Sequence, residues 1–541
     1  MQLNKKVTVD NFGANIILKQ AGIQFDAGYS ENNGKDFFET KQVPKFIHHC
    51  GYALTSLFKC IQSEIHLSDP ELNIIQKTIQ GTISCLPRDD PILLPLIKAN
   101  MNVLNSTNMN NKKLGTITTC ITSSPMVITE CRTGAHPSHV RFPGQTPPNA
   151  KRINKIVTVD TKIPDWHSTG SYAVAGETIT IKCSPQVASS KLISVRIGCH
   201  SDQLHNCSGD LKRAPDICTT TLIERVETTL SNAFGGLIYI DVHHHHDQHP
   251  LGTIHFELKN IVQAAYFILD KTTLSEWQST LKNDNIAPWS EFQSRNAIIT
   301  VPYSYAKTIK DPTSVLRTWD KGIDLCAELC GKSDARHRPM RYVPDVQISC
   351  GYMHSGYPIM CHMDQCESDQ LLNVKNLISN WGLWHETGHN HQNDAWTPEG
   401  TVEVTVNLFT IYVIWTFEGN NWSQMKNRLL YKQGMEHHRR EFFKSPNFEH
   451  WKDEPFVGLW LYVELIEGFG FEPFKKVFRD YLRLSGVDLP KSNQQKRDEW
   501  AMRFSRQVGR NICPLFSIWH VPISQHVNKQ LSDLPDWSPA V

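Results

Sequence analysis

Hydrophobic residues recur at helical spacing near both ends of the chain. Residues 46–64 and 72–86 carry apolar side chains every three or four positions, a period that predicts helices. The same period returns after residue 263. There it predicts helices over 312–332, 369–392, 401–417, 424–439, 456–468 and 472–485. The pattern therefore predicts two helical regions that flank a central region of different character.

The central region contains short runs in which apolar and polar residues alternate and β-branched side chains are frequent. These runs lie at residues 155–159, 177–182, 192–197, 236–242 and 253–258. Alternation with a period of two is typical of strands that are buried on one face. The runs together predict a β-sandwich over residues 153–262. Before it, the Pro- and Gly-rich residues 134–152 predict a linker.

We therefore expect an α+β protein: a short helical N-terminal region, a β-sandwich, and a mostly helical third domain. The predicted bounds are 1–133, 134–152 for the linker, 153–262 and 263–541. A chain of 541 residues can bury several cores without disulfide bonds. Its most apolar stretch, 404–417, is shorter than the roughly 18 residues of a membrane span. We interpret this stretch as a buried helix and expect no transmembrane segment.

The charge and composition of the chain limit the kinds of partner that we expect. The net charge of +1 creates no field that would attract nucleic acid or an anionic membrane. The basic residues between 307 and 341 are mixed with acidic ones and lack interleaved aromatic residues, so we expect no nucleic-acid partner. The first residues lack the apolar run of a secretory signal. The 15 cysteines are therefore expected to be reduced thiols in a cytoplasmic protein.

One pentapeptide carries specific chemistry, because residues 385–389 match the pattern H-E-x-x-H. Two histidines four positions apart lie on one face of a helix, where both can bind one zinc ion. Glu386 could then act as the general base that removes a proton from zinc-bound water, which attacks a peptide carbonyl. The alternative is a solvated helix face. This alternative is disfavoured, because the apolar spacing of residues 371–384 predicts a helix that is buried on one side.

A zinc site of this kind needs a third ligand besides His385 and His389. Glu403 is the only charged residue of the apolar segment 402–415, where a lone carboxylate is costly unless a cation balances it. Alternatively, Glu403 could only complement a helix dipole. Glu399 is the rival ligand, although its Pro and Gly neighbours predict a turn. We predict Glu403, and a site with two histidines, one glutamate and an open position matches the catalytic pattern.

Four other residues are candidates for the lining of a substrate cleft. His354 and Tyr357 lie in a Gly-rich segment, and either could stabilise an oxyanion, although packing is the simpler explanation. Gly235 and Gly236 could let a substrate backbone approach closely, or they could mark a bulge or turn. The histidine-rich residues 243–249 are interpreted as a solvated loop.

Several separated motifs resemble the enhancin-like, mucin-targeting zinc metallopeptidase family. They are HETGHNHQ at 385–392, EVTVN at 403–407, DWHSTGSY at 165–172, AFGGLIYI at 233–240 and MHSGYP at 353–358. The resemblance implies a zincin-type (gluzincin-like) domain with zinc bound by His385, His389 and Glu403. It also implies that Glu386 is the catalytic base.

Within that family, the chain resembles the vertebrate TRP-channel-associated factors (TCAF) from about residue 1 to 535. This likeness implies binding to a TRP cation channel, an influence on its delivery to the plasma membrane, and a peripheral location there. Those proteins usually have a longer, amidotransferase-like N-terminal region, of which residues 28–35 would be a remnant. The alternatives are an active zinc endopeptidase that cleaves O-glycosylated proteins, and a glycan-binding module that uses the β-sandwich.

Overall fold

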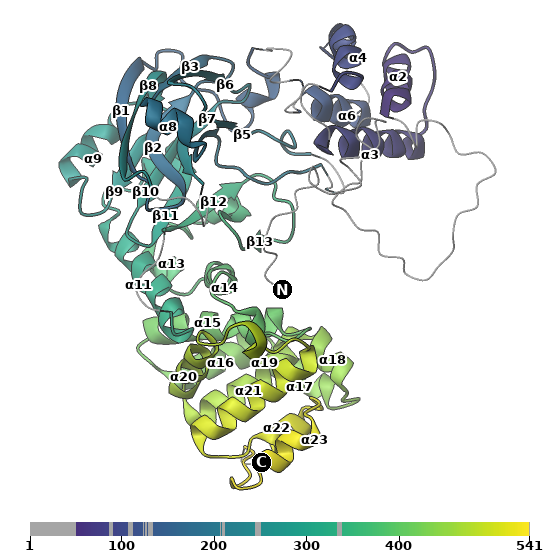
Figure 1. Ribbon diagram of the computed structural model, residues 1–541, viewed down its shortest axis with the longest axis vertical. Coiled ribbons are helices and arrows are strands. Elements are labelled where there is room, and N and C mark those ends of the chain that lie inside the picture. The colour runs from purple at the N-terminus through teal and green to yellow at the C-terminus, as the bar shows by residue number, and fades with distance from the viewer. Residues whose placement is uncertain are drawn as a thin grey trace.

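The computed structural model describes residues 50–85, 90–105, 112–122, 124, 127, 134–205, 207, 211–243, 250–332 and 338–539. It contains N-terminal helices, a curved antiparallel sheet, a smaller mixed sheet and a helical C-terminal region (Figure 1). The predicted α+β class is confirmed. The possible remnant at 28–35 and most of the histidine-rich run lie outside the described residues. Among the described residues, no helix combines the length and the apolar character that a membrane span needs.

The N-terminal helices pack around a small core of their own. They are α2 (Cys50–Ile61), α3 (Asp69–Cys85), α4 (Leu93–Ala99), α5 (Met101–Asn105) and α6 (Lys112–Thr122). Their buried residues include Leu54, Leu57, Ile75, Ile79 and Ile117. The first two helices agree with the apolar spacing of the sequence, since that spacing places the buried residues on one face.

The Pro- and Gly-rich segment that follows is packed against the domains beside it. The backbone N–H of His136 donates to the carbonyl of Ala233 at 2.8 Å, in the curved sheet domain. The indole N–H of Trp289, from the second sheet, donates to the carbonyl of Pro143 at 2.7 Å. The segment therefore contacts both sheets.

The first sheet forms a sandwich-like β-domain. Its strands are β1 (Arg152–Asp160), β2 (Asp165–Ala173), β3 (Thr178–Lys182), β4 (Ile193–Ile197), β5 (Thr219–Leu222), β6 (Glu227–Ser231), β7 (Gly236–Val242) and β8 (Thr253–Gln263), with α8 (Pro185–Ser190). The order is β5-β4-β7-β2-β8-β3-β6, and β1 pairs with β8. Strand β2 opposes β7 with Trp166 across from Asp241, and the register shifts between Ser168 and Tyr172. The alternating runs predicted these strands because every second side chain enters the core.

The second sheet belongs to the next domain and was not predicted from the sequence. Its strands are β9 (Ala265–Ile268), β10 (Trp289–Gln293), β11 (Ala297–Pro302), β12 (Met340–Asp345), β13 (Met353–His354) and β14 (Ile359–His362). The order β13-β14-β12-β11-β10-β9 makes β13 an edge strand. These strands are short, and most of their residues are buried, so they lack a clear period.

Helices make up the rest of the molecule. They are α9 (Leu274–Leu281), α10 (Tyr303–Ala306), α11 (Thr313–Leu329), α12 (Asp364–Glu367), α13 (Val374–Leu377), α14 (Trp381–His389), α15 (Val402–Phe417), α16 (Trp422–Asn427), α17 (Met435–Phe442), α18 (Phe448–Asp453), α19 (Pro455–Phe469), α20 (Glu472–Tyr481), α21 (Asn493–Val508), α22 (Cys513–Ile518) and α23 (Gln525–Gln530). The single helix expected at 369–392 is interrupted. Helix α14 begins after Asn380, because the side chain of Asn380 accepts the N–H of Leu383 at 2.8 Å and caps this helix.

Helices α14 and α15 form the centre of this domain. Helix α15 is buried nearly all round and contacts α11, α14 and α19. Its close approach to α14 depends on Gly388, where a Cβ would lie 3.0 Å from the side chains of Val406 and Phe409. Two rigid helices are thereby held side by side, with the first turn of α15 next to the middle of α14.

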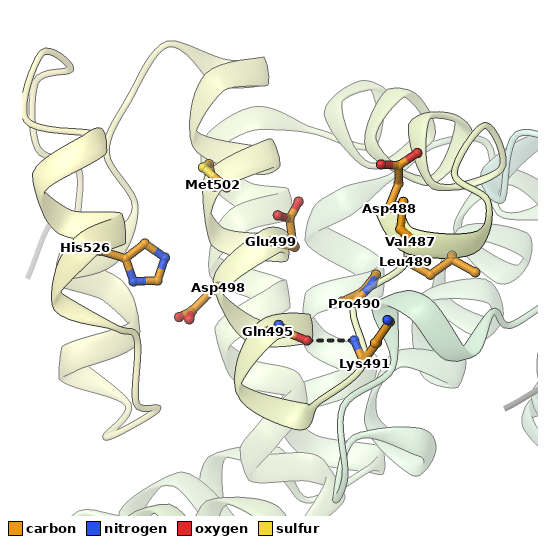
Figure 2. A pocket seen from close by; sticks show the side chains of 10 residues that line it. All are labelled: Val487, Asp488, Leu489, Pro490, Lys491, Gln495, Asp498, Glu499, Met502 and His526. Atoms are coloured by element: carbon orange, nitrogen blue, oxygen red, sulfur yellow. Dashed lines mark hydrogen bonds between the residues drawn. The ribbon is translucent and has the colours of Figure 1, made fainter.

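A hollow of about 400 Å³ lies at the C-terminal end of the domain (Figure 2). Residues 487–491, α21 and α23 form its walls, and Asp498, Glu499 and His526 are among the side chains that line it. None of the residues predicted for the zinc site belongs to this lining.

Candidate metal centre

The two histidines of the pentapeptide converge with Glu403 at the contact between α14 and α15. The Nε2 atoms of His385 and His389 are 3.1 Å apart. Glu403 Oε2 lies 3.0 Å from His385 Nε2 and 3.5 Å from His389 Nε2. Among the described residues this is the only cluster of three or more His, Cys, Asp or Glu side chains with ligand atoms within 4.8 Å of one another.

These separations fit a tetrahedral metal ion. Ligand atoms at about 2.0–2.1 Å from zinc stand roughly 3.3 Å apart when the angles are tetrahedral. The three separations observed are 3.0, 3.1 and 3.5 Å. Two imidazole nitrogens and a carboxylate are also the donor types that zinc binds in sites with one open position. The residues present therefore fit a zinc ion.

Two amide side chains fix the orientation of the histidine rings. His385 Nδ1 contacts Asn407 Oδ1 at 2.9 Å, and His389 Nδ1 contacts Gln392 Oε1 at 2.7 Å. An amide oxygen only accepts, so each Nδ1 carries a proton and each Nε2 faces the other two ligands. The amide of Asn407 donates to the carbonyl of Glu403 at 2.8 Å, and that of Gln392 donates to Thr405 Oγ1 at 2.8 Å.

The close approach of the three side chains shifts the pKa values of Glu403 and His389. Hydrogen bonds from His385 and His389 hold the pKa of Glu403 well below its usual value, against the effect of partial burial. Burial disfavours the charged form of His389, but its bonds to Glu403 and Gln392 outweigh burial and raise its pKa. The carboxylate therefore stays ionised where the two rings meet.

Glu403 is more exposed than the sequence predicts. The sequence predicts a lone carboxylate buried in an apolar helix. In the structure the Glu403 side chain is 55% exposed, because the first turn of α15 emerges at the surface. Its place at the helix N-terminus also complements the helix dipole. The position of Glu403 beside the two histidines, and not its burial, now supports it as a ligand.

The rival residue Glu399 faces another helix. Its carboxylate accepts the side-chain N–H of Asn493 from α21 at 2.9 Å, and its backbone N–H donates to Asn493 Oδ1 at 3.0 Å. It lies in the turn that its Pro and Gly neighbours predict. Glu399 is not part of the three-residue cluster.

Glu386 lies on α14 beside the cluster and is 8% exposed. Its carboxylate makes no hydrogen bond to any group that the structure describes. Burial is the main cause of its raised pKa, and the like charge of Glu403 adds to it, while His385 and His389 oppose it. A carboxylate with a raised pKa and free oxygens is suited to accept a proton near neutral pH.

His354 faces the same region from the edge strand β13. Its Nε2 lies 2.8 Å from Asp202 Oδ2, and its Nδ1 lies 3.0 Å from the carbonyl of Ser355. Both partners only accept, so these contacts favour the doubly protonated ring. The bond to Asp202 outweighs burial and raises the pKa of His354. When protonated, His354 lowers the pKa of Glu386.

The remaining predicted cleft residues take part in packing contacts. Tyr357 lies against Trp166 at 5.5 Å between ring centroids, and the guanidinium of Arg338 stacks over its ring at 3.5 Å. Gly235 and Gly236 have φ angles of +71° and +153°. Added Cβ atoms would lie 2.6 Å from the backbone of Ala173 in β2 and 2.7 Å from that of Gly198, the residue after β4. The two glycines thus permit close strand packing.

Three residues of this region, Asn407, Gln392 and Asp202, have roles that the sequence did not predict. Asn407 and Gln392 stand four and three positions after Glu403 and His389, so helical spacing could have identified them as orienting partners. Asp202 carries no such signal, because it lies in another domain and precedes His354 by 152 positions.

Comparisons with known families agree with the motifs. The family described as "Peptidase M60, enhancin and enhancin-like" matches residues 260–520. The "N-terminal domain of M60-like peptidases" matches residues 148–253. The two matches correspond to the helical domain with its mixed sheet and to the β-domain.

Curated relatives include TRPM8 channel-associated factors. The human TRPM8 channel-associated factor 2 is 36% identical over 375 residues, which cover 69% of this chain and 40% of that protein. The mouse TRPM8 channel-associated factor 3 is 34% identical over 401 residues, which cover 73% and 42%. The chain thus spans about two-fifths of the length of the relatives it matches.

Solved structures share the fold at low identity. The IMPa metallopeptidase from Pseudomonas aeruginosa has a TM-score of 0.59 and 11% identity, over 90% of this chain and 62% of that one. The ZmpB metallopeptidase from Clostridium perfringens has a TM-score of 0.52 and 16% identity, over 71% and 82%. The resemblance seen in the sequence motifs is confirmed, and the chain belongs to the peptidase M60, enhancin and enhancin-like family.

Proposed function

We propose that this chain is a TRP-channel-associated factor-like member of its family that retains a zinc metallopeptidase-like site. The observation that supports the site best is the convergence of His385 Nε2, His389 Nε2 and Glu403 Oε2 at separations suited to zinc. The role in channel regulation rests on the names of the relatives, which are TRPM8 channel-associated factors.

The residues around this site support hydrolysis of a peptide bond. Zinc, when bound there, would supply a water of lowered pKa and a Lewis acid for a carbonyl oxygen. Glu386 accepts a proton from water on its free carboxylate and can pass it to the departing amine nitrogen. Protonated His354, held by Asp202, would supply positive charge for the negative charge that develops on the carbonyl oxygen.

Zinc content is the first measurement. The purified chain should bind one equivalent of zinc, and the Glu386→Gln and Glu399→Gln variants should bind it equally well. Glu403→Gln should lose affinity by more than the roughly 10–100-fold typical of an outer partner, since it removes a direct ligand. Equal zinc affinity of Glu403→Gln and Glu399→Gln would remove Glu403 from the site.

Cleavage is the second measurement. A related metallopeptidase, IMPa, has been solved with an O-glycopeptide, so O-glycosylated proteins are the first substrates to test. We expect cleavage by the wild type and a loss of about 10²–10⁴-fold in Glu386→Gln. A zinc-loaded wild type that cleaves nothing in a broad panel would leave the site without peptidase function.

Channel regulation is a separate candidate function. The whole chain, co-expressed with a TRPM8 channel, should co-purify with it and change its current. We expect this effect to survive Glu386→Gln, because binding to a partner does not need a proton acceptor. Loss of the effect in a folded, zinc-loaded Glu386→Gln variant would instead tie regulation to catalysis.

A glycan array with the whole chain tests the remaining alternative, a glycan-binding role.

A further inference from the structure

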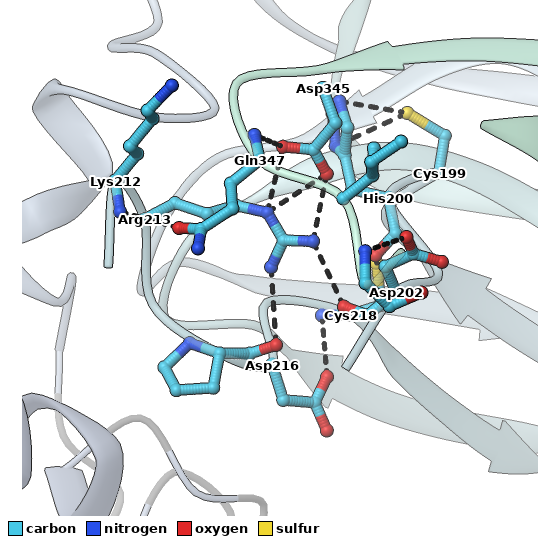
Figure 3. A network of polar contacts seen from close by, with 12 residues as sticks. Cys199, His200, Asp202, Lys212, Arg213, Asp216, Cys218, Asp345 and Gln347 are labelled. Carbon is cyan, nitrogen blue, oxygen red and sulfur yellow. Dashed lines mark hydrogen bonds and ion pairs between the residues drawn. The ribbon is translucent and has the colours of Figure 1, made fainter. Parts of the chain in front are cut away.

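Two segments from different domains are joined along one side of the metal centre. The first lies between β4 and β5 and contributes Asp202, Cys207 and Arg213, and the second is the β12–β13 loop, residues 346–352. Arg213 of the first forms an ion pair of 2.8 Å with Asp345, just before the second, and both side chains are fully buried (Figure 3). The backbone N–H of Lys212 also donates to Gln347 Oε1 at 2.7 Å.

The other end of the β12–β13 loop is held in the same way. Asp202 Oδ2 accepts the backbone N–H of Ser349 at 2.7 Å and also contacts His354 Nε2 at 2.8 Å. The guanidinium of Arg213 donates to the carbonyl of Asp202 at 3.0 Å, which links the two anchor points. The segments are therefore fixed relative to each other on both sides of residue 349.

A cysteine from each segment lies between these anchor points. Cys207 Sγ is 3.9 Å from the carbonyl oxygen of Ile348 and 3.8 Å from that of Ser349. A carbonyl oxygen lies about 3 Å from the next Cα, so the sulfur is within roughly 7 Å of the Cys350 Cα. A disulfide requires the two Cα atoms to lie within about 6.8 Å of each other and the two sulfurs to be bonded. The Cys207 sulfur thus lies beside the Cys350 backbone, and a shift of the exposed residues 349–352 would bring the second sulfur against it.

The two thiols differ in accessibility. Cys350 is the only exposed cysteine among those that the structure describes, and Cys207 is half-buried. Burial raises the pKa of the Cys207 thiol, while Arg213 lowers it and Cys350 adds to the increase. A dissolved oxidant therefore meets Cys350 first, and Cys207 is the thiol placed to react with the product.

We propose that Cys207 and Cys350 are a redox-responsive pair that forms a reversible disulfide between the two domains under a peroxide oxidant. The Cys350 thiolate attacks hydrogen peroxide, the O–O bond breaks, and a sulfenic acid and hydroxide form. The Cys207 thiolate then attacks the Cys350 sulfur, the S–O bond breaks, and hydroxide leaves. Two thiols have lost two electrons and two protons, the protons converting the two hydroxides to water.

The disulfide would act on the metal-centre side of the molecule. It would join the segment that carries Asp202 to the loop that leads into β13 and His354. The disulfide would then hold the segment of Asp202 close to His354. The proposal does not depend on whether the chain cleaves peptides.

The test uses the whole chain, reduced, buffer-exchanged and treated with low hydrogen peroxide. Free thiols are then alkylated, and the chain is mapped by mass spectrometry without reduction. We expect a peptide pair joined through Cys207 and Cys350, its disappearance with dithiothreitol, and faster migration of the oxidised monomer in non-reducing gels. The link closes a loop between positions 143 apart, which compacts the denatured chain.

Variants separate a pair from a single reactive thiol. Cys207→Ser should abolish the link and accumulate Cys350 sulfinic acid, because no second thiol intercepts the sulfenic acid. Cys60→Ser, a half-buried cysteine of α2, is the matched control and should keep the link. The pairing is wrong if Cys350 overoxidises equally in wild type and Cys207→Ser. A Cys350 disulfide to another cysteine or to a second chain would overturn it as well.

Discussion

At the scale of single residues, two amide side chains fix the orientation of the histidine rings. Asn407 and Gln392 accept the Nδ1 protons of His385 and His389, which leaves both Nε2 atoms free for a metal ion. Asn407 is 2% exposed, so water cannot replace it. We therefore expect the zinc affinity of the proposed site to depend also on residues that do not touch the metal.

Replacing Asn407 tests this dependence. Asn407→Leu should lower zinc affinity about 10–100-fold, because the His385 ring loses the acceptor that fixes its tautomer. Asn407→Asp keeps an acceptor oxygen and should retain most of the affinity. Competition with a zinc chelator measures both variants, and circular dichroism checks their folding. Equal affinities in the two variants would mean that Asn407 only fills space.

His354 offers a pH-dependent prediction. Its folded pKa is raised above the ordinary 6.5, mainly by Asp202, so its ion pair stabilises the fold fully below pH 6.5. That stabilisation is lost as pH rises through the folded pKa. Asp202→Asn should therefore destabilise more at pH 5 than at pH 9, and NMR should show a lower pKa for His354. An unchanged His354 pKa in the variant would contradict the pairing.

At the scale of elements, the metal centre depends on how closely helices approach one another. Gly322 of α11 faces Trp384 of α14, and a Cβ at Gly322 would lie 2.1 Å from the indole ring. Trp384 is fully buried and precedes His385. The α11–α14 contact thus positions the helix that carries the histidines.

Gly322→Ala should destabilise the protein by about 1–3 kcal/mol, because the buried ring must move. Gly81→Ala in α3 is the matched control, since a Cβ there meets no atom within 4 Å. It should be neutral or stabilising by about 0.5–1 kcal/mol, from the higher helix propensity of alanine. Urea unfolding, followed by tryptophan fluorescence and circular dichroism, measures both. Similar effects of the two substitutions would argue against a tight α11–α14 contact.

At the scale of the whole molecule, the β-domain and the helical domain are joined by buried polar contacts. Arg213 and Asp345 come from different domains, and neither side chain is exposed. Arg213 also donates to the carbonyls of Ala214 and Asp202, so its charge is fully engaged. A buried pair of this kind fixes one relative placement of the domains, because separation would leave a charge without a partner.

Arg213→Met should cost about 3–5 kcal/mol of stability, since it leaves Asp345 buried without its cation. The exposed pair between Arg295 and Asp324 provides the control. Arg295→Met should cost less than about 1 kcal/mol, because solvent already screens that pair. Thermal unfolding of the two variants gives the comparison. Equal losses would show that the buried pair does not join the domains.

The sequence alone determined the features that depend on local periodicity and on a contiguous motif. Alternating residues predicted the β-domain, apolar spacing predicted α11 and α15, and the pentapeptide placed two histidines on one helical face. These patterns can be read locally because side chains near in sequence share a face. Only the tertiary structure decided the rest. It brought Glu403 beside the histidines from an exposed helix start and paired Asp202 with His354 across 152 positions. It also built the second sheet from short buried strands. Such contacts arise from packing between distant elements, which no local pattern encodes.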